Sequence, residues 1–220
     1  KKYCNGTAPL QCGSTSINEN GNGSLMRILP VALYAYLKNL DDISIRKLTN
    51  EVSSLTHAHE VSRLGCYIYV QFIICLLKGY TKEEAYKHIQ YLDYSAYDMH
   101  SLKLYKRILD EQIEVQRLDQ IKSTGYIVDT LESAMWIFMN AEHYKEAIIA
   151  STNIGGDTDT IGAIVGSMAG IYYGFDSIPS NWLEKLQRKD YLIELVDRFE
   201  KSVAVLPKNV SKPIHRAKKS

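Results

Sequence analysis

The sequence predicts an all-α fold, and three observations support this prediction. Apolar residues recur at three- and four-residue spacing in nearly every periodic segment, which is the period of a helix with one buried face. No convincing run alternates apolar and polar residues as a half-buried strand would. The 220 residues are 45% hydrophobic and 23% charged, a composition that supplies a sizeable core and excludes a disordered chain. We therefore expect one compact multi-helix domain over residues 1–206.

The expected helices follow one another with short connections after a polar, glycine-rich opening that continues through Gly23. Pro30 either kinks the first helix or marks its true first turn, where proline is tolerated. Gly79 is expected to end the strongly apolar third helix. Thr81 and Glu84 have the spacing of a capping box, in which each side chain satisfies a free backbone amide of the next helix. The expected ranges are 25–40, 43–55, 59–77, 81–91, 101–113, 128–140, 144–152, 161–173, 179–186 and 191–203.

Charge and cysteine content narrow the class of protein. The formal net charge is +1, but five basic residues and no acidic ones lie in the last thirteen positions, which leaves 21 basic and 25 acidic groups elsewhere. This balance is not the basic footprint of a nucleic-acid-binding protein, and we expect residues 207–220 to be a solvated basic tail. The four cysteines lack CxxC pairing, so we expect free thiols and a cytoplasmic protein. The start has no apolar run of the kind found in signal peptides or membrane anchors. Neither nucleic acid nor a membrane is an expected partner.

The run 161–173 is apolar but too short to cross a bilayer, which needs about 20 residues. We expect a buried helix. Gly162, Gly166 and Gly170 recur every four residues within it, and each glycine costs a helix interior about 1 kcal/mol relative to alanine. Three of them indicate a face against which another element packs closely.

Two carboxylates and two hydroxyls precede this helix, behind the pair Gly155 and Gly156. One interpretation is helix capping, because aspartate and threonine satisfy first-turn amides and aspartate suits the positive end of the helix dipole. One cap would be enough, however, and Asp157 and Asp159 repel each other unless a cation or a proton lies between them. Carboxylate and hydroxyl oxygens are the ligands that Mg²⁺ prefers. The segment therefore predicts either a metal site or a cap.

The segment 21–27, which reads GNGSLMR, is a glycine-rich turn that leads into a helix. Free amides at a helix start, close backbone approach at Gly21 and Gly23, and Arg27 one turn later would suit a phosphate or a diphosphate. The segment lacks the Gly-Lys-Ser/Thr ending of a P-loop, and no strand precedes it. An ordinary Asn-Gly turn with Ser24 as the helix cap is the alternative.

His57 and His59 shortly precede Glu60, and two imidazoles with a carboxylate are candidate ligands of a zinc site. Residues two apart on a helix face different ways, and the helical two-histidine zinc motif needs a spacing of four, so we do not expect zinc. His57 either donates a hydrogen bond to a ligand or is a helix-start residue without a further role. Tyr126 follows Gly125 and precedes a helix, where its ring could stack on a base.

Together these segments resemble the ADP-ribosylglycohydrolases, the family that includes the dinitrogenase reductase-activating glycohydrolase and the ADP-ribosyl-acceptor hydrolases. The matching pieces occur in the family's order: GNGSLMR at 21–27, Thr-His at 56–57, GYIVDTLESAMW at 125–136 and GGDTDT at 155–160. The resemblance covers residues 21 to about 173. It implies an all-α fold and a Mg²⁺-dependent hydrolase that cleaves the glycosidic bond between ADP-ribose and an ADP-ribosylated protein or small molecule. A catalytically silent ADP-ribose-binding or structural member is the alternative, and a nucleotide phosphohydrolase is a third, more general one.

The resemblance also implies roles for individual residues. Asp157, Asp159 and Thr160 match the family's metal ligands, which hold two Mg²⁺ ions, with Mn²⁺ as a substitute. His57 matches the position near the diphosphate or ribose, and Tyr126 the ring that stacks on adenine. Glu19 matches an acidic residue beside the scissile bond, and we expect Glu19 and Asp159 to lie closest to the chemistry. The residues expected to bind substrate are Asn22, Gly23, Ser24, Met26, Arg27, His57, Tyr126, Gly155 and Gly156.

One part of the family pattern has no counterpart here. The Thr-Asp-Asp-Thr motif, which supplies the other metal ligands in the family, is not found before Gly21, and the pair at 41–42 comes after the glycine turn. The chain also does not begin with methionine, so we expect a fragment or a processed product. Absence of that segment would remove helices from the core and expose apolar surface, which favours binding of a partner, association with a second copy, or aggregation.

Overall fold

The computed structural model describes residues 2–204, and within that range it contains helices and no strand, which confirms the all-α prediction. The basic tail expected at 207–220 lies outside the described residues. The α-helices are α1 (Leu29–Leu37), α2 (Asp42–Ser54), α3 (Glu60–Leu77), α4 (Lys82–Gln90), α5 (Met99–Leu104), α6 (Lys106–Leu109), α7 (Ile127–Asn140), α8 (Tyr144–Asn153), α9 (Thr158–Tyr173), α10 (Ser180–Lys185) and α11 (Lys189–Ala204). Short 3₁₀ turns are η1 (Tyr3–Asn5), η2 (Pro9–Gln11), η3 (Leu25–Arg27), η4 (Ile113–Val115), η5 (Leu118–Gln120) and η6 (Phe175–Ser177).

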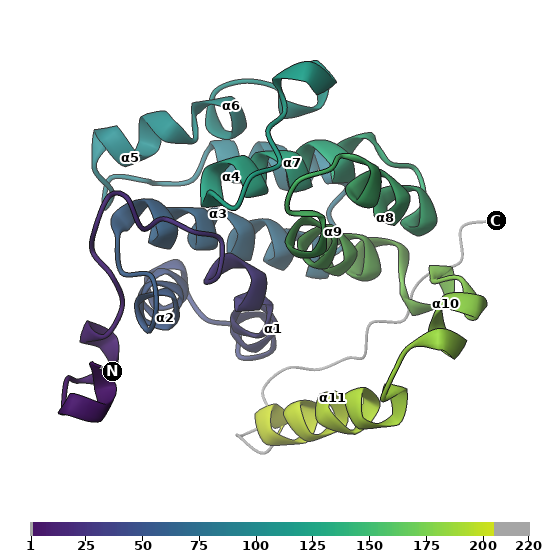
Figure 1. Ribbon diagram of the computed structural model, residues 1–220, viewed down its shortest axis with the longest axis horizontal. Coiled ribbons are helices and arrows are strands. Elements are labelled where there is room, and N and C mark those ends of the chain that lie inside the picture. Colours follow the sequence, from purple (N-terminus) through teal and green to yellow (C-terminus); the bar gives the residue numbers. More distant parts are fainter. Residues whose placement is uncertain (1, 205–220) are drawn as a thin grey trace.

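Helix α3 forms the centre of the fold. It crosses the middle of the molecule in Figure 1, with α1 and α2 on one side and α4 and α7 on the other. Its C-terminal half continues toward α9, which it also contacts. By length and composition α3 could cross a membrane, and it is the one described helix that could, but 83% of it is buried inside the protein. Burial in a helical core accounts for its apolar sequence.

The predicted helix boundaries at Gly79 and Thr81 are confirmed. Gly79 has φ +86° just after α3, and the amides of Gly79 and Tyr80 donate to carbonyls in the last turn of that helix, at 3.0 and 3.1 Å. This is the arrangement that glycine permits at a helix C-terminus. At the start of α4, the Thr81 hydroxyl accepts from the Glu84 amide at 3.1 Å and the Glu84 carboxylate accepts from the Thr81 amide at 2.9 Å.

Two predicted helices are wrong as single elements. The range 25–40 contains η3 and then α1, and Pro30 lies in the first turn of α1. The ring of Pro30 fits that turn because first-turn amides need no helical partner. The range 101–113 divides into α5, α6 and the start of η4. The division between α5 and α6 falls at Tyr105, whose buried hydroxyl donates to the Val61 carbonyl at 2.8 Å.

The glycines of α9 provide the packing face that their spacing predicted. Helix α8 lies along α9, and side chains about one turn apart on α8 meet the three glycines. A Cβ added at Gly166 would lie 3.3 Å from Ile148, and one at Gly162 would lie 3.5 Å from the Ser151 hydroxyl. The pairing of α8 with α9 places the loop between them, residues 154–157, at the N-terminus of α9.

All four cysteines are free thiols, as predicted. Cys66 and Cys75 are buried in α3, where burial raises the pKa of each thiol to about 11. At neutral pH both are therefore protonated and behave as small apolar side chains.

Candidate functional site

Asn22 joins three segments that are far apart in the sequence. Its side-chain nitrogen donates to the Asp157 carboxylate at 2.6 Å and to the Thr130 hydroxyl at 2.9 Å. Asp157 precedes α9, Thr130 lies in the first turn of α7, and Asn22 belongs to the glycine turn. The structure thus brings together the glycine turn, the start of α7 and the acidic loop, which are the three longer motifs of the sequence.

Backbone hydrogen bonds fix these loops against one another. The Asn22 amide donates to the Gly125 carbonyl at 3.0 Å, and the Ile127 amide donates to the Asn20 carbonyl at the same distance. Between these two bonds, Gly21 and Tyr126 form an antiparallel bridge. The loop residues therefore keep a fixed position without a sheet.

The acidic loop, residues 154–157 and the start of α9, is bonded to the segment that precedes α7. The Asp157 amide donates to the Ser123 carbonyl at 3.0 Å. Gly155 and Gly156 have φ values of +78° and +68°, in the left-handed region that favours glycine. A Cβ at Gly156 would lie 2.0 Å from the Ser123 carbonyl oxygen, so this position has no room for any side chain. Gly156 is thus required for the close approach of the two loops.

Asp157 occupies the N-cap position of α9, but its side chain makes no capping hydrogen bond. The carboxylate instead faces Asn22, whose hydrogen bond lowers the pKa of Asp157, and the side chains of Asp159 and Thr160 lower it further. Thr160 is 4% exposed, whereas Asp159 is exposed to solvent. The capping interpretation therefore does not account for the Asp157 side chain.

The oxygens of this loop have the chemistry that a magnesium ion requires. Two carboxylates and one hydroxyl are hard ligands, and Asn22 engages only Oδ2 of Asp157. Within residues 2–204 no group of three or more histidine, cysteine, aspartate or glutamate side chains is arranged to hold a metal. The three oxygens thus fit one part of a magnesium coordination sphere, which takes about six ligands, several of them waters.

The glycine turn is built differently from the alternative of an ordinary capped turn. Ser24 makes no side-chain capping bond, and its buried hydroxyl accepts from the Cys66 thiol at 3.4 Å. Met26 is 50% exposed on the same turn. Arg27 donates to the Val52 carbonyl at 3.1 Å and to the Thr56 hydroxyl at 2.6 Å. Its guanidinium is therefore bonded to the end of α2 and to the loop that follows.

The two histidines have separate surroundings. His57 lies against the glycine turn, because a Cβ at Gly23 would lie 2.9 Å from its Cε1 atom. Burial lowers the pKa of His57 and nearby Arg27 lowers it further, while the Glu19 charge raises it. Glu19 is exposed. His59 is the N-cap of α3, where its Nδ1 accepts from the Val61 amide at 3.3 Å.

Tyr126 forms the N-cap of α7, with its ring half-buried against the core. Its amide donates to the Thr124 hydroxyl at 3.1 Å, and that hydroxyl donates to the Asp129 carboxylate at 2.7 Å. Burial raises the pKa of Tyr126 and Asp129 raises it further, so the phenol stays neutral. The part of the ring that is exposed is available to a flat ligand group.

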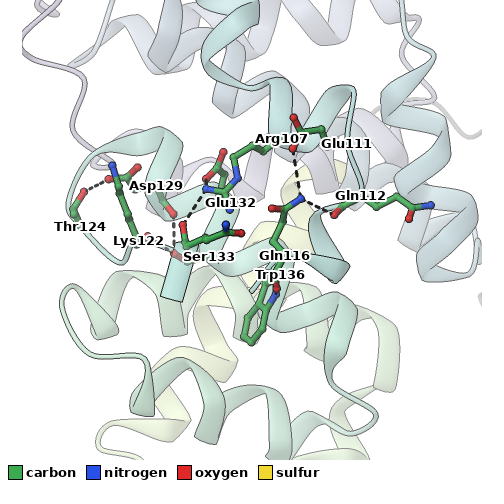
Figure 2. Close-up of polar contacts among 11 residues, drawn as sticks. Arg107, Glu111, Gln112, Gln116, Lys122, Thr124, Asp129, Glu132, Ser133 and Trp136 are labelled. Atoms are coloured by element: carbon green, nitrogen blue, oxygen red, sulfur yellow. Dashed lines mark hydrogen bonds and ion pairs between the residues drawn. The ribbon is translucent and has the colours of Figure 1, made fainter. Parts of the chain in front are cut away.

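Figure 2 shows polar contacts between α7 and the part of the chain that precedes it. Arg107 of α6 pairs with Glu132 of α7 at 3.2 Å and donates to the Gln120 carbonyl at 3.0 Å. The next residue of α7, Ser133, donates its hydroxyl to the Lys122 carbonyl at 2.5 Å, and the Trp136 indole, one turn after Glu132, donates to the Gln116 carbonyl at 2.8 Å. One face of α7 thus fixes the chain from residue 116 to residue 122.

Glu132 should make stability depend on pH. Its side chain is 6% exposed, and burial raises its pKa to about 7 although Arg107 lowers it. The folded state therefore binds the proton more tightly than the unfolded chain, whose pKa is near 4.5. The stability that protonation provides is complete below about pH 4.5 and is lost as the pH rises through about 7. A shift of this size corresponds to about 3 kcal/mol.

We expect Glu132→Gln to remove this dependence, because glutamine keeps an acceptor for Arg107 but cannot ionise. Urea unfolding of the variant and the wild type at pH 5 and pH 8 measures the effect. The free energy of unfolding of the variant, relative to the wild type, should increase between these pH values. An unchanged difference would show that Glu132 does not titrate in this range.

Three residues that hold the site were missed at the sequence level. Asn20 donates to the Ile17 carbonyl at 2.9 Å and accepts from the Ser62 hydroxyl at 2.8 Å, so it fixes the loop that carries Glu19. Ser123 contributes a backbone carbonyl, and Thr130 a hydroxyl. Both lie in or beside the segment 125–136 that carried the resemblance, but their partners come from other segments, which spacing alone does not reveal.

Comparison with known proteins indicates the family of the chain. The family model described as ADP-ribosylglycohydrolase matches residues 1–208. An ADP-ribosylarginine hydrolase, Tri1, from Serratia proteamaculans is 28% identical over 190 residues, covering 85% of this chain and 48% of that protein. The ADP-ribosyl-[dinitrogen reductase] glycohydrolase of Rhodospirillum rubrum is 32% identical over 183 residues, covering 83% of this chain and 54% of that protein. Human ADP-ribosylhydrolase ARH3 is 27% identical over 219 residues, covering 83% and 59%.

A solved structure supports the same assignment. A chain from a structure described as an ADP-ribosylglycohydrolase-related protein complex superposes with a TM-score of 0.73 at 25% sequence identity, covering 87% of this chain and 62% of that one. The present chain spans about half the length of the curated relatives that it matches. The fold, the order of the motifs and the family match together show that the chain belongs to the ADP-ribosylglycohydrolase family.

Proposed function

We propose that this chain provides the ADP-ribose-binding and metal-binding face of a hydrolase that cleaves the glycosidic bond between ADP-ribose and an acceptor. The observation that carries the proposal is the Asn22 side chain, which bonds the glycine turn directly to the Asp157 carboxylate at 2.6 Å. A ligand that lies along the glycine turn would thereby come next to the acidic loop. ADP-ribosylated proteins and ADP-ribosylated small molecules are the proposed substrates.

We assign the roles by position around Asn22. Tyr126 offers its half-buried ring to the adenine, and Gly21 and Gly23 allow close approach of the substrate. Glu19 is exposed on the loop that Asn20 fixes and would take a proton from the attacking water at a carboxylate oxygen. Cleavage passes through an oxocarbenium-like state, so a nearby carboxylate also stabilises developing positive charge.

Asp157, Asp159 and Thr160 would hold magnesium, and Mn²⁺ would be an acceptable substitute. When bound, the ion supplies Lewis-acid chemistry that orients the ribose and a water molecule. The Asn22 side chain donates to Oδ2 of Asp157 and holds this carboxylate in place, while the carboxylate keeps further acceptor capacity for an ion. Exposed Asp159 is the carboxylate of this set with the greatest access to substrate.

A second candidate function is binding of ADP-ribose without hydrolysis. It is favoured by the ligand count, because the acidic loop supplies three protein oxygens and no group of three His, Cys, Asp or Glu side chains is arranged for a metal within residues 2–204. Such a site would hold the ion less tightly than a complete one.

Release of free ADP-ribose from ADP-ribosylated arginine separates the two candidates. The chain is incubated with this substrate in Mg²⁺ or in a chelator, and free ADP-ribose is measured by chromatography. We expect release in Mg²⁺, its loss in the chelator, and a strong decrease in Glu19→Gln with Mg²⁺ present. Binding of ADP-ribose without release would support the second candidate, and absence of both would contradict each of them.

A further inference from the structure

The two nitrogen edges of the His57 imidazole have different surroundings. Its Nε2 edge faces the glycine turn, because a Cβ at Gly21 would lie 3.6 Å from Nε2. Within residues 2–204, no hydrogen-bond partner is found for Nε2. This edge is therefore the one available to a ligand that lies along the glycine turn.

The Nδ1 edge is bonded to the protein. Nδ1 lies 2.8 Å from the Thr56 hydroxyl oxygen. The same oxygen accepts from Nη2 of Arg27 at 2.6 Å, and Nη1 of Arg27 is fixed by the Val52 carbonyl at 3.1 Å. A guanidinium can only donate, so the Thr56 oxygen must be the acceptor in that bond. The contacts thus form a chain from Arg27 through Thr56 to His57.

This chain favours one arrangement of the protons. The Thr56 oxygen has two lone pairs, so it can accept from Arg27 and from a protonated Nδ1 at once. Donation from Thr56 to Nδ1 is the arrangement in which the hydroxyl proton also finds an acceptor among the described residues. A hydroxyl that accepts a charged hydrogen bond is also polarised into a stronger donor. Nδ1 then acts as the acceptor, and a neutral ring with an unprotonated Nδ1 carries its proton on Nε2.

We propose that Arg27 and Thr56 are positioning residues that hold His57 as the neutral Nε2–H tautomer, a hydrogen-bond donor aimed at an oxygen of the bound substrate. The identity of that oxygen as part of ADP-ribose rests on the proposed function, whereas the tautomer does not. Arg27 then acts on the ligand indirectly, through Thr56 and His57, since both of its bonded nitrogens donate to protein oxygens.

The charges around His57 agree with a neutral ring. Burial and the Arg27 charge both lower the pKa of His57. The opposing charge is Glu19, which raises it. The backbone of Ser14 is bridged to that of His57, and the Ser14 side chain is not ionisable.

The ring nitrogens report the tautomer directly by ¹⁵N NMR. The whole chain is labelled with ¹⁵N-histidine, and the His57 signals are assigned by their loss in His57→Gln. Above the titration of the ring, we expect Nε2 to have the shift of a protonated nitrogen and Nδ1 the shift of an unprotonated one that accepts a hydrogen bond. Thr56→Val should move the Nδ1 signal, and Thr56→Ser should restore it. A proton on Nδ1 in the wild type, or an unchanged signal in Thr56→Val, would overturn the proposal.

Thr56 is exposed, so both substitutions should leave the fold intact, and circular dichroism can verify this. A calorimetric titration with ADP-ribose tests the ligand contact. We expect about tenfold weaker binding in Thr56→Val, the loss typical of one misdirected hydrogen bond, with most of the affinity regained in Thr56→Ser. Equal affinity in Thr56→Val and wild type would refute the ligand contact. If wild type bound no ADP-ribose, the proposed function would fail while the NMR result stood by itself.

Discussion

Asp157→Asn combined with Asp159→Asn is expected to lower kcat/KM for release of ADP-ribose by about a hundredfold or more. Losses of this size follow when groups that stabilise the transition state electrostatically are removed. Asparagine keeps the shape of each side chain, and at position 157 it keeps an oxygen that can accept the 2.6 Å bond from Asn22. The loop should therefore stay in place while the ligand charge is lost.

Asp176→Asn is the matched control. Asp176 lies in η6, is exposed, and is remote in sequence from the acidic loop. Its replacement changes the net charge by one and should leave release of ADP-ribose at the wild-type rate. Wild-type turnover in the double variant would show that the acidic loop does not take part in the reaction.

Gly156→Ala is expected to disrupt the site through the backbone. The added Cβ would lie 2.0 Å from the Ser123 carbonyl oxygen, and the residue would have to keep a φ of +68°. The two loops must then separate, which breaks the hydrogen bond from the Asp157 amide to the Ser123 carbonyl. We expect a lower melting temperature and at least about a hundredfold loss of kcat/KM, since displacement by about 1 Å can cost that much.

Substitution of the neighbouring Gly155 distinguishes the effect of this clash from the effect of backbone strain alone. Gly155 also has a left-handed φ, of +78°, but a Cβ there meets nothing within 4 Å. Gly155→Ala should therefore cost only about 1 to 2 kcal/mol for the left-handed conformation and should retain most of the activity. Equal effects of the two substitutions on activity would mean that contact between the loops is not what positions Asp157.

Sequence patterns predicted the elements that depend on local signals. The capping box at Thr81 and the glycine stop at Gly79 are confirmed because each is satisfied by residues within one turn. The apolar helix α3 and the glycine face of α9 are confirmed because burial and close packing leave a helical period in the sequence. The division of 101–113 was not predictable in this way. It falls at Tyr105, which donates to a carbonyl 44 residues away.

The same contrast between local signals and distant partners holds for the site residues. The sequence identified the glycine turn and the acidic loop, and the structure joins them through Asn22. It did not indicate that Arg27 would bond to Val52 and Thr56, because those partners lie 25 and 29 residues away. Thr130 was also missed, since a threonine in a helix is usually uninformative and its role becomes visible only beside Asn22.

The central claim is that Asp157 and Asp159 hold a metal ion against bound ADP-ribose. Calorimetric titration of ADP-ribose into the wild type and into the double asparagine variant, each with Mg²⁺ and with a chelator, measures this most directly. The account predicts that Mg²⁺ strengthens binding to the wild type by about tenfold or more and has no effect on the variant. Binding of equal strength in all four titrations would contradict it.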